Sequence, residues 1–237
     1  MSRILLKISG EQLAGDQKRG LSVERATWIA REILRAKQKA PGAQIVLVVG
    51  AGNWLRGADF ASENPLVRPV TADNMGMLGT IINAVALSDI FNSQNLPARA
   101  LSNVSCQQVI DDYTYRRAIS HLDKDRVVII GGGTGRPFFT TDTSALNLAV
   151  ELGCDVVAKA TKVDGVFDDD PVKNPAAKKL AKVSFAQAVD NPKIRVMDKA
   201  ALAIAAEHRK PIVVFELLRE GNIARMAAGE PVGTRIG

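Results

Sequence analysis

The sequence has no long hydrophobic run. Apolar stretches such as Ile45–Val49 and Val127–Ile130 are far shorter than the ~20 residues that a membrane-spanning helix requires. The first residues also lack the pattern of a secretory signal peptide. On these grounds the sequence predicts a cytoplasmic protein with no membrane partner.

Cysteine and histidine are scarce. The two cysteines, Cys106 and Cys154, stand far apart without a C-x-x-C spacing, and the two histidines, His121 and His208, lie in helix-like surroundings without metal-ligand spacing. This pattern argues against a disulfide framework and a zinc site. We expect ordinary packing for all four side chains.

Acidic residues are fewer than basic ones: the chain has 25 aspartates and glutamates and 31 lysines and arginines, which gives a net charge of +6. A positive charge permits the binding of any anion, from a nucleic acid to a small phosphorylated substrate. The basic residues in the last third of the chain are interleaved with alanine at helical spacing and lack aromatic neighbours. We therefore expect a solvated helical face there and no nucleic-acid partner.

Short apolar runs that end in small residues or glycine alternate with helical patterns along the chain. Continuous apolar strands alternating with helices indicate a parallel sheet with helices on both faces. Ser22 stands where an N-cap belongs, before a long helical pattern. The sequence predicts an α/β protein, a three-layer α/β/α sandwich with a mainly parallel central sheet, in one domain (1–237) with two lobes of approximately 1–153 and 154–237. The apolar runs are RILLKIS (3–9), QIVLVV (44–49), ARALS (98–102), RVVII (126–130), DVVAKAT (155–161) and PIVVFE (211–216).

Three of these runs end in glycine, at Gly10, at Gly50 with Gly52, and at Gly131–Gly135. No P-loop sequence occurs, and GAGNWLRG has Leu55 where the dinucleotide-binding fingerprint needs its third glycine. Ligands of a parallel sheet bind beyond the carboxyl ends of its strands, where glycine lets backbone N–H groups approach a phosphate. The alternative is that these glycines only terminate strands.

Three charged residues belong to the same predicted edge of the sheet. Lys7 interrupts an apolar strand, Arg56 follows the second glycine turn, and Asp142 stands at the start of a helix. Alternatively, Lys7 snorkels to solvent and Asp142 only caps its helix. A site with lysine, arginine, backbone amides and one aspartate, without a Ser–His pair, suits phosphoryl transfer, which depends on positioning and charge neutralisation.

Seven segments, in order along the chain, resemble the bacterial uridylate (UMP) kinases of the amino-acid-kinase family. The segment TGRPFFTTD resembles the uridylate-binding branch rather than the relatives that phosphorylate carboxylates. The resemblance implies transfer of the γ-phosphoryl group of MgATP to UMP, giving UDP and ADP in pyrimidine nucleotide biosynthesis, without a general base. It also implies the amino-acid-kinase fold and a homohexamer, with an acceptor UMP lobe of approximately residues 1–153 and an ATP lobe of residues 154–237. The segments are LLKISGEQLAG, GAGNWLRG, DNMGMLGTIINAVAL, GGGTGRPFFTTDTSA, KATKVDGVFDDDP, VMDKAA and GEPVGTRI.

The resemblance also implies roles for single residues. Lys7 would neutralise charge on the migrating group, Arg56 would contact the phosphates, and Asp142 would organise the catalytic lysine. Asp142 is also a candidate ligand of the Mg²⁺ that ATP carries, and no other metal site is expected. The implied ATP-binding residues are Lys7, Ser9, Gly10, Gly52, Arg56, Thr161, Phe167 and Asp170. The implied UMP-binding residues are Ala51, Asp73, Thr134, Gly135, Arg136, Pro137, Phe138, Phe139, Thr140 and Thr141.

Two residues depart from the family pattern. Ala51 replaces a glycine and would be strained if its position needed a positive φ. Arg136 replaces an asparagine and should alter or tighten the binding of the acceptor phosphate. Phe138 and Phe139 would either form an apolar wall for uracil or pack in the core.

Other interpretations stay open. The segment 168–170 (DDD) is interpreted as a solvated loop, because the spacing of an EF-hand is absent. A kinase of the same fold with another small acceptor would keep Lys7 and Asp142 but lack the TGRPFFTTD segment. A catalytically silent nucleotide-binding regulator or storage scaffold is disfavoured by Lys7, Arg56 and Asp142.

Overall fold

A computed structural model of the chain describes residues 2–17, 19–169, 174, 176–191, 194 and 196–237. Within these residues, nine strands form one sheet, and two short strands, β7 (Val166–Phe167) and β8 (Lys179–Leu180), pair separately. The strands of the large sheet are β1 (Arg3–Ile8), β2 (Gln44–Val49), β3 (Ala98–Ser102), β4 (Asp111–Asp112), β5 (Val127–Gly131), β6 (Val156–Thr161), β9 (Lys182–Val183), β10 (Ile212–Glu216) and β11 (Thr234–Ile236).

The strand order in the large sheet is β4-β3-β5-β2-β1-β6-β10-β11-β9. All neighbouring strands are parallel except β10 and β11, so the prediction of a mainly parallel sheet is confirmed. The first five strands in this order precede residue 153 and the last four follow residue 154. These two groups of strands form one continuous sheet, joined by the pairing of β1 with β6. The division into a UMP lobe and an ATP lobe stays a prediction.

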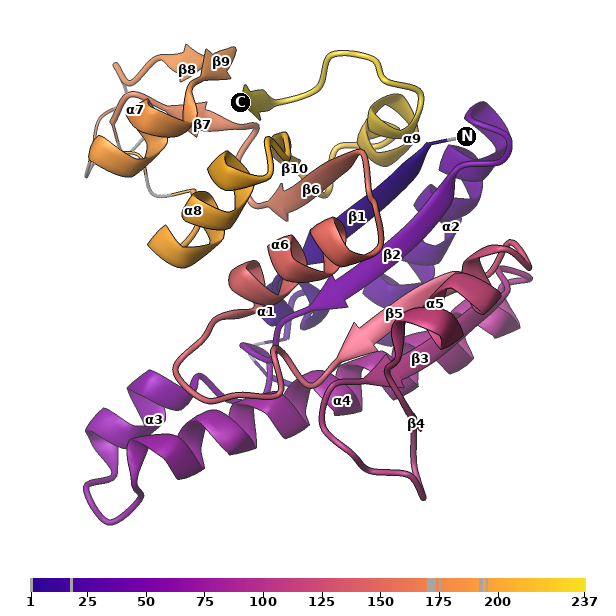
Figure 1. The fold of residues 1–237 in the computed structure, drawn as a ribbon, viewed down its shortest axis with the longest axis vertical. Helices are drawn as coiled ribbons and strands as arrows, with labels where there is room; N and C mark the ends of the chain where they lie inside the picture. Colours follow the sequence, from indigo (N-terminus) through magenta and orange to yellow (C-terminus); the bar gives the residue numbers. More distant parts are fainter. Residues whose placement is uncertain (1, 18, 170–173, 175, 192–193, 195) are drawn as a thin grey trace.

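Helices cover both faces of the sheet (Figure 1). One buried apolar cluster joins the sheet to α2, α4 and α9, and a second joins the opposite face to α5, α6, α7 and α8. The predicted three layers are confirmed. The described helices are α1 (Gly10–Leu13), α2 (Val23–Lys39), α3 (Gly57–Glu63), α4 (Pro69–Ser93), α5 (Tyr115–Leu122), α6 (Thr141–Glu151), α7 (Phe185–Asp190), α8 (Lys199–Glu207) and α9 (Asn222–Ala227).

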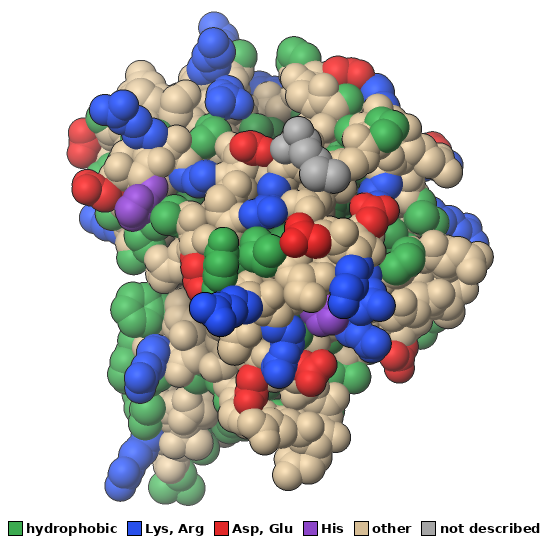
Figure 2. Space-filling model, turned by 45° about the vertical axis from the view of Figure 1, so that its right-hand side comes forward, with side chains coloured by type: hydrophobic (Ala, Val, Ile, Leu, Met, Phe, Trp, Pro, Cys, Tyr) green, Lys and Arg blue, Asp and Glu red, His purple; other side chains and the backbone are tan. Residues whose placement is uncertain are grey.

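Local sequence signals explain where the helices begin. The Ser22 hydroxyl accepts a hydrogen bond from the Arg25 N–H at 3.1 Å, which confirms the predicted N-cap of α2. Ile29 and Ile33 of that helix are fully buried against the sheet. Figure 2 shows basic side chains spread over one face of the molecule, with acidic side chains among them.

Helix α4 has the length and the composition of a helix that could cross a membrane. No uninterrupted apolar run in the sequence is long enough to do so. The helix packs instead against β3, β5 and α2, and 44% of its most apolar window is buried in the protein. Asn83, in the middle of the helix, is fully buried and donates a hydrogen bond to the Gly50 carbonyl at 2.8 Å. The side-chain oxygen of Asn83, Oδ1, accepts a hydrogen bond from the Trp54 indole N–H at 2.7 Å. These bonds make α4 a support for the loop that follows β2.

Candidate active site

The carboxyl ends of β1, β2 and β6 open into a cavity of about 610 Å³. Most of the predicted site residues meet there, although they come from distant parts of the chain. Those that line the cavity are Lys7, Ser9, Gly10, Ala51, Gly52, Arg56, Asp73, Arg136, Phe139, Thr140, Thr141, Asp142 and Thr161. The predicted residues Thr134, Gly135, Pro137, Phe138 and Phe167 do not line it, and Asp170 lies outside the described residues.

A buried carboxylate between two lysines lies at the centre of the cavity. Asp142 Oδ1 is 2.7 Å from Lys7 Nζ, and Asp142 Oδ2 accepts a hydrogen bond from Lys159 Nζ at 2.6 Å. Burial alone would raise the pKa of the Asp142 carboxyl, but the charges of Lys7 and Lys159 hold that pKa below its ordinary value. Asp142 is therefore ionised, and two cations share one carboxylate.

Lys159 was missed by the sequence prediction. It interrupts the apolar run of β6 as Lys7 interrupts that of β1, and the two residues are direct neighbours in the register of the sheet. The reasoning that selected Lys7 would therefore have selected Lys159. Burial lowers the pKa of its ammonium group, and Asp142 opposes that shift. Lys159 also donates to the Val196 carbonyl, and with Asp142 it borders a second cavity of about 500 Å³ against α7 and α8.

The loops after β1 and β2 lie backbone against backbone. A Cβ atom at Gly10 would stand 2.4 Å from the backbone nitrogen of Gly52, so only glycine fits at position 10. Ala51, between Gly50 and Gly52, does not have a positive φ. The strain considered for this alanine therefore does not arise. Its methyl group faces α4, where a Cβ on Gly79 would stand 2.9 Å from it.

The loop between β5 and α6 carries the TGRPFFTTD segment. Phe138 has a φ of 66°, and its backbone N–H donates a hydrogen bond to Asp73 Oδ2 at 2.8 Å. The Phe138 and Phe139 residues are 72% and 55% exposed, so the alternative of core packing for these rings is wrong. Phe139 lines the cavity, which leaves its ring available to a bound ligand.

Thr140, rather than Asp142, caps helix α6. Its hydroxyl accepts from the Asp142 N–H at 3.0 Å and donates to the carboxylate of Asp198. Asp198 also accepts from the Thr143 hydroxyl and caps α8 by accepting from the Ala201 N–H at 2.8 Å. Asp198 lines the cavity and was missed as a site residue, although the sequence analysis noted its VMDKAA segment. Because the Thr140 hydroxyl caps α6, the Asp142 carboxylate is not needed as a cap and pairs with Lys7 and Lys159.

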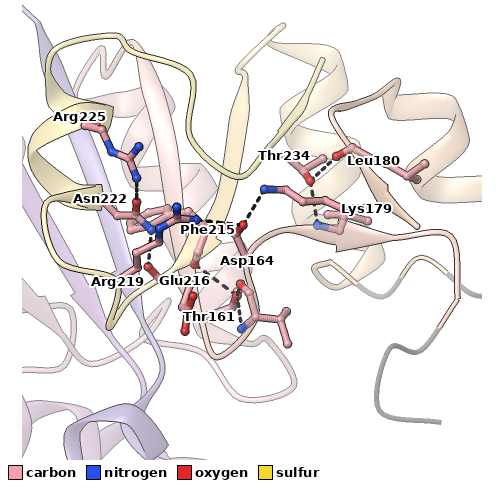
Figure 3. A network of polar contacts seen from close by, with 12 residues as sticks. Thr161, Asp164, Lys179, Leu180, Phe215, Glu216, Arg219, Asn222, Arg225 and Thr234 are labelled. Atoms are coloured by element: carbon pink, nitrogen blue, oxygen red, sulfur yellow. Dashed lines mark hydrogen bonds and ion pairs between the residues drawn. The ribbon is translucent and has the colours of Figure 1, made fainter. Parts of the chain in front are cut away.

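A polar network holds the turn between β6 and β7 (Figure 3). Asp164 in this turn accepts from Lys179 at 2.9 Å and from Arg219 at 3.4 Å. The Thr161 hydroxyl bonds to the carbonyl oxygen of Val163 at 2.7 Å, which fixes the end of β6 at the cavity. Beyond the turn, in the loop predicted at 168–170, Asp168 accepts a hydrogen bond from the Lys178 N–H at 2.7 Å; residue 170 lies outside the described residues.

The described residues form no group of three or more histidine, cysteine, aspartate or glutamate side chains that could hold a metal ion. Both oxygens of Asp142 face lysines, and Asp198 is engaged by hydroxyl and amide donors. A hard cation such as Mg²⁺ prefers several oxygen ligands with free lone pairs. The side chains present therefore do not fit a metal held by the protein alone.

The chain is similar to known proteins over nearly its whole length. A model of the amino acid kinase family matches residues 2–216. The chain belongs to the amino acid kinase family. The chain is 44% identical over 234 residues to a uridylate kinase of Methylococcus capsulatus, across 99% of this chain and 96% of that protein. It is 46% identical over 235 residues to a uridylate kinase of Deinococcus radiodurans, across 99% of this chain and 94% of that protein. The crystal structure of UMP kinase from Bacillus anthracis has a TM-score of 0.93 and 38% identity, across 100% of this chain and 96% of that chain.

The charge cluster predicts a specific dependence of stability on pH. Because the pKa of Asp142 is lower in the folded chain than in the unfolded chain, the unfolded state binds more protons as the pH falls. The stability from ionised Asp142 is complete above its unfolded pKa of about 4 and is lost as the pH falls toward the folded pKa. Asp142→Asn should lower the free energy of unfolding by about 3–5 kcal/mol at pH 7, since two buried lysines lose their partner.

Urea denaturation at pH 7 and pH 3 measures this effect. The difference in the free energy of unfolding between the wild-type protein and Asp142→Asn should be about 1 kcal/mol smaller at pH 3 than at pH 7. Asp89→Asn, which changes an exposed carboxylate on α4, is the control and should follow the wild-type curve. A difference that is equal at both pH values would contradict the assignment of a lowered pKa.

Proposed function

We propose that this member of the amino acid kinase family transfers the γ-phosphoryl group of MgATP to UMP, giving UDP and ADP. The observation that carries the proposal is the Lys7–Asp142–Lys159 cluster, which lies at the cavity bordered by the TGRPFFTTD segment. The names of the relatives support UMP as the acceptor. The retained charge cluster speaks against a catalytically silent binding protein, because such a protein has no need for two buried cations.

The proposed mechanism is a direct in-line transfer. A phosphate monoester has its second pKa near 6, so the acceptor oxygen is already largely ionised at neutral pH and needs no general base. Lys7 and Lys159 stabilise the negative charge on the transferring group, and Asp142 holds both ammonium groups in place. Arg56 neutralises phosphate charge at the mouth of the cavity.

Two sets of residues around the cavity are proposed to hold the two nucleotides. Asp73, Ala51 and the segment 134–141 are proposed to hold UMP, and Arg136 brings a positive charge to the acceptor side. Lys7, Ser9, Gly10, Gly52, Arg56, Thr161, Phe167 and Asp170 are proposed to hold ATP. Residues of both proposed sets line the same cavity as Asp142 and Lys159, which supports a meeting point between the ligands at this cluster.

Mg²⁺ is proposed to arrive with ATP and to be held mainly by its phosphates. The protein side chains do not supply a metal site of their own among the described residues. When bound, the ion would neutralise charge on the phosphate chain. The chain's own contribution is the pair of lysines and the backbone amides of the glycine loops.

We further propose a cytoplasmic homohexamer. The support for assembly is an exposed apolar strip on α4 that includes Leu78 and Ile82, which are 46% and 51% exposed. Exposed apolar patches on soluble proteins often mark contacts between proteins. Sedimentation of the purified chain would report the oligomeric state.

A coupled assay of ADP release tests the function directly. With MgATP as donor, UMP should give turnover well above CMP, aspartate and N-acetylglutamate. Aspartate or N-acetylglutamate as the preferred acceptor would identify a carboxylate kinase of the same fold. Absence of turnover with every acceptor would favour a silent nucleotide-binding protein.

Lys7→Ala should lower turnover by about 10²–10³-fold, because a charge lost from a dry site is worth several kcal/mol of transition-state stabilisation. The matched control is Lys37→Ala, which removes a largely buried lysine paired with Asp125 far from the cavity. The control should keep wild-type turnover. Steady-state kinetics that show near-normal turnover in Lys7→Ala would refute the role of Lys7.

Arg136→Asn should raise the KM for UMP several-fold and leave the KM for ATP nearly unchanged. Within the described residues, no ion pair joins Arg136 to a carboxylate, so its charge is available to an anion at the cavity. Initial rates at varied UMP measure the effect. An unchanged KM for UMP would show that Arg136 does not contact the acceptor.

A further inference from the structure

Glu11 bridges two cations across the mouth of the cavity. Arg56 donates a hydrogen bond from Nη2 to Glu11 Oε1, and Lys162 Nζ is 3.5 Å from Glu11 Oε2. Arg56 belongs to the loop after β2 and Lys162 to the loop after β6, so Glu11 ties together cations from the two halves of the sheet. All three residues line the cavity.

The Glu11 side chain lies over Gly52. A Cβ atom at Gly52 would stand 3.1 Å from Glu11 Cγ, so the absence of a side chain at this glycine makes room for the glutamate. The carboxylate therefore occupies the space between Arg56 and Lys162 at the glycine loops, where a phosphate would also be placed by the proposed function.

The contacts of Glu11 are weak enough to be exchanged. The Arg56 and Lys162 side chains are 62% and 70% exposed, and ion pairs in such surroundings contribute little free energy. A polyphosphate brings more charge than a carboxylate and can offer two oxygens to a guanidinium group. Asp142 differs, because the side chains of Lys7 and Lys159 are only 8% and 17% exposed. That carboxylate is held firmly, whereas Glu11 can be replaced.

We propose that Glu11 is a built-in competitor of phosphate, which determines how tightly the cavity binds phosphoanions by occupying Arg56 and Lys162 until a ligand displaces it. The proposal rests on the proposed function, since the phosphate chain of the donor nucleotide is the ligand that would displace it. Its consequence is that a weakly held anion does not fill the site, whereas a ligand with further contacts along the cavity does. The same competition limits the affinity for the product ADP.

Calorimetric titration with inorganic tripolyphosphate tests the proposal without any acceptor. Glu11→Gln keeps the shape of the side chain but frees both cations, so the Kd for tripolyphosphate should fall by about fivefold at low salt. The effect should diminish at high salt, where exposed charges are screened. Glu11→Asp keeps the charge on a shorter side chain and should give an intermediate Kd.

Two further variants separate a local effect from a change in net charge. Glu220→Gln removes one negative charge from an exposed carboxylate that pairs with Arg35 outside the cavity, and it should leave the Kd unchanged. In an Arg56→Gln background, Glu11→Gln should have a much smaller effect, because one of the two freed cations is already absent.

Equal Kd values for Glu11→Gln and Glu220→Gln would overturn the proposal, as would weaker binding by Glu11→Gln. An absence of tripolyphosphate binding in every variant would also overturn it. These outcomes are independent of the acceptor assay, because that assay can fail with UMP while tripolyphosphate binding still responds to Glu11. Circular dichroism of each variant establishes that the chain is folded.

Discussion

The site depends on one carboxylate buried between two lysines. Removing three charged groups from water is costly, and the cost is offset only where each oxygen of Asp142 meets its own ammonium group. Because Asp142 lies at the start of α6, this requirement fixes the distance between that helix and β1. It also depends on the pairing of β1 with β6, which places Lys159 beside Lys7. The cluster retains an excess of one positive charge, which is what a transferring phosphoryl group needs.

The rest of the fold places this cluster. Parallel pairing brings the carboxyl ends of β1, β2 and β6 to one edge, and the glycines there let the loops approach one another closely. Helix α4 supports the loop after β2 through the buried Asn83. Thr140 and Asp198 join the starts of α6 and α8, so the helix that carries Asp142 is tied to α8.

The carboxylates of the cavity differ in how firmly they are held. Asp142 is buried with its lysines, Asp198 is bound by hydroxyl and amide groups, and Asp73 accepts from the backbone of Phe138. Glu11 is the most easily exchanged of those described here, because its cations are largely exposed. The depth of burial therefore separates the groups that organise the site from the group that a ligand can replace.

The amino-acid sequence by itself determined the layers, the parallel sheet and the edge at which the candidate site lies, because apolar periodicity and glycine placement are local signals. It also selected Lys7, Arg56 and Asp142. Tertiary structure alone showed that Lys159 shares Asp142, that Thr140 rather than Asp142 caps α6, and that the rings of Phe138 and Phe139 are exposed. These features depend on contacts between residues far apart in the chain, whose partners no local pattern identifies.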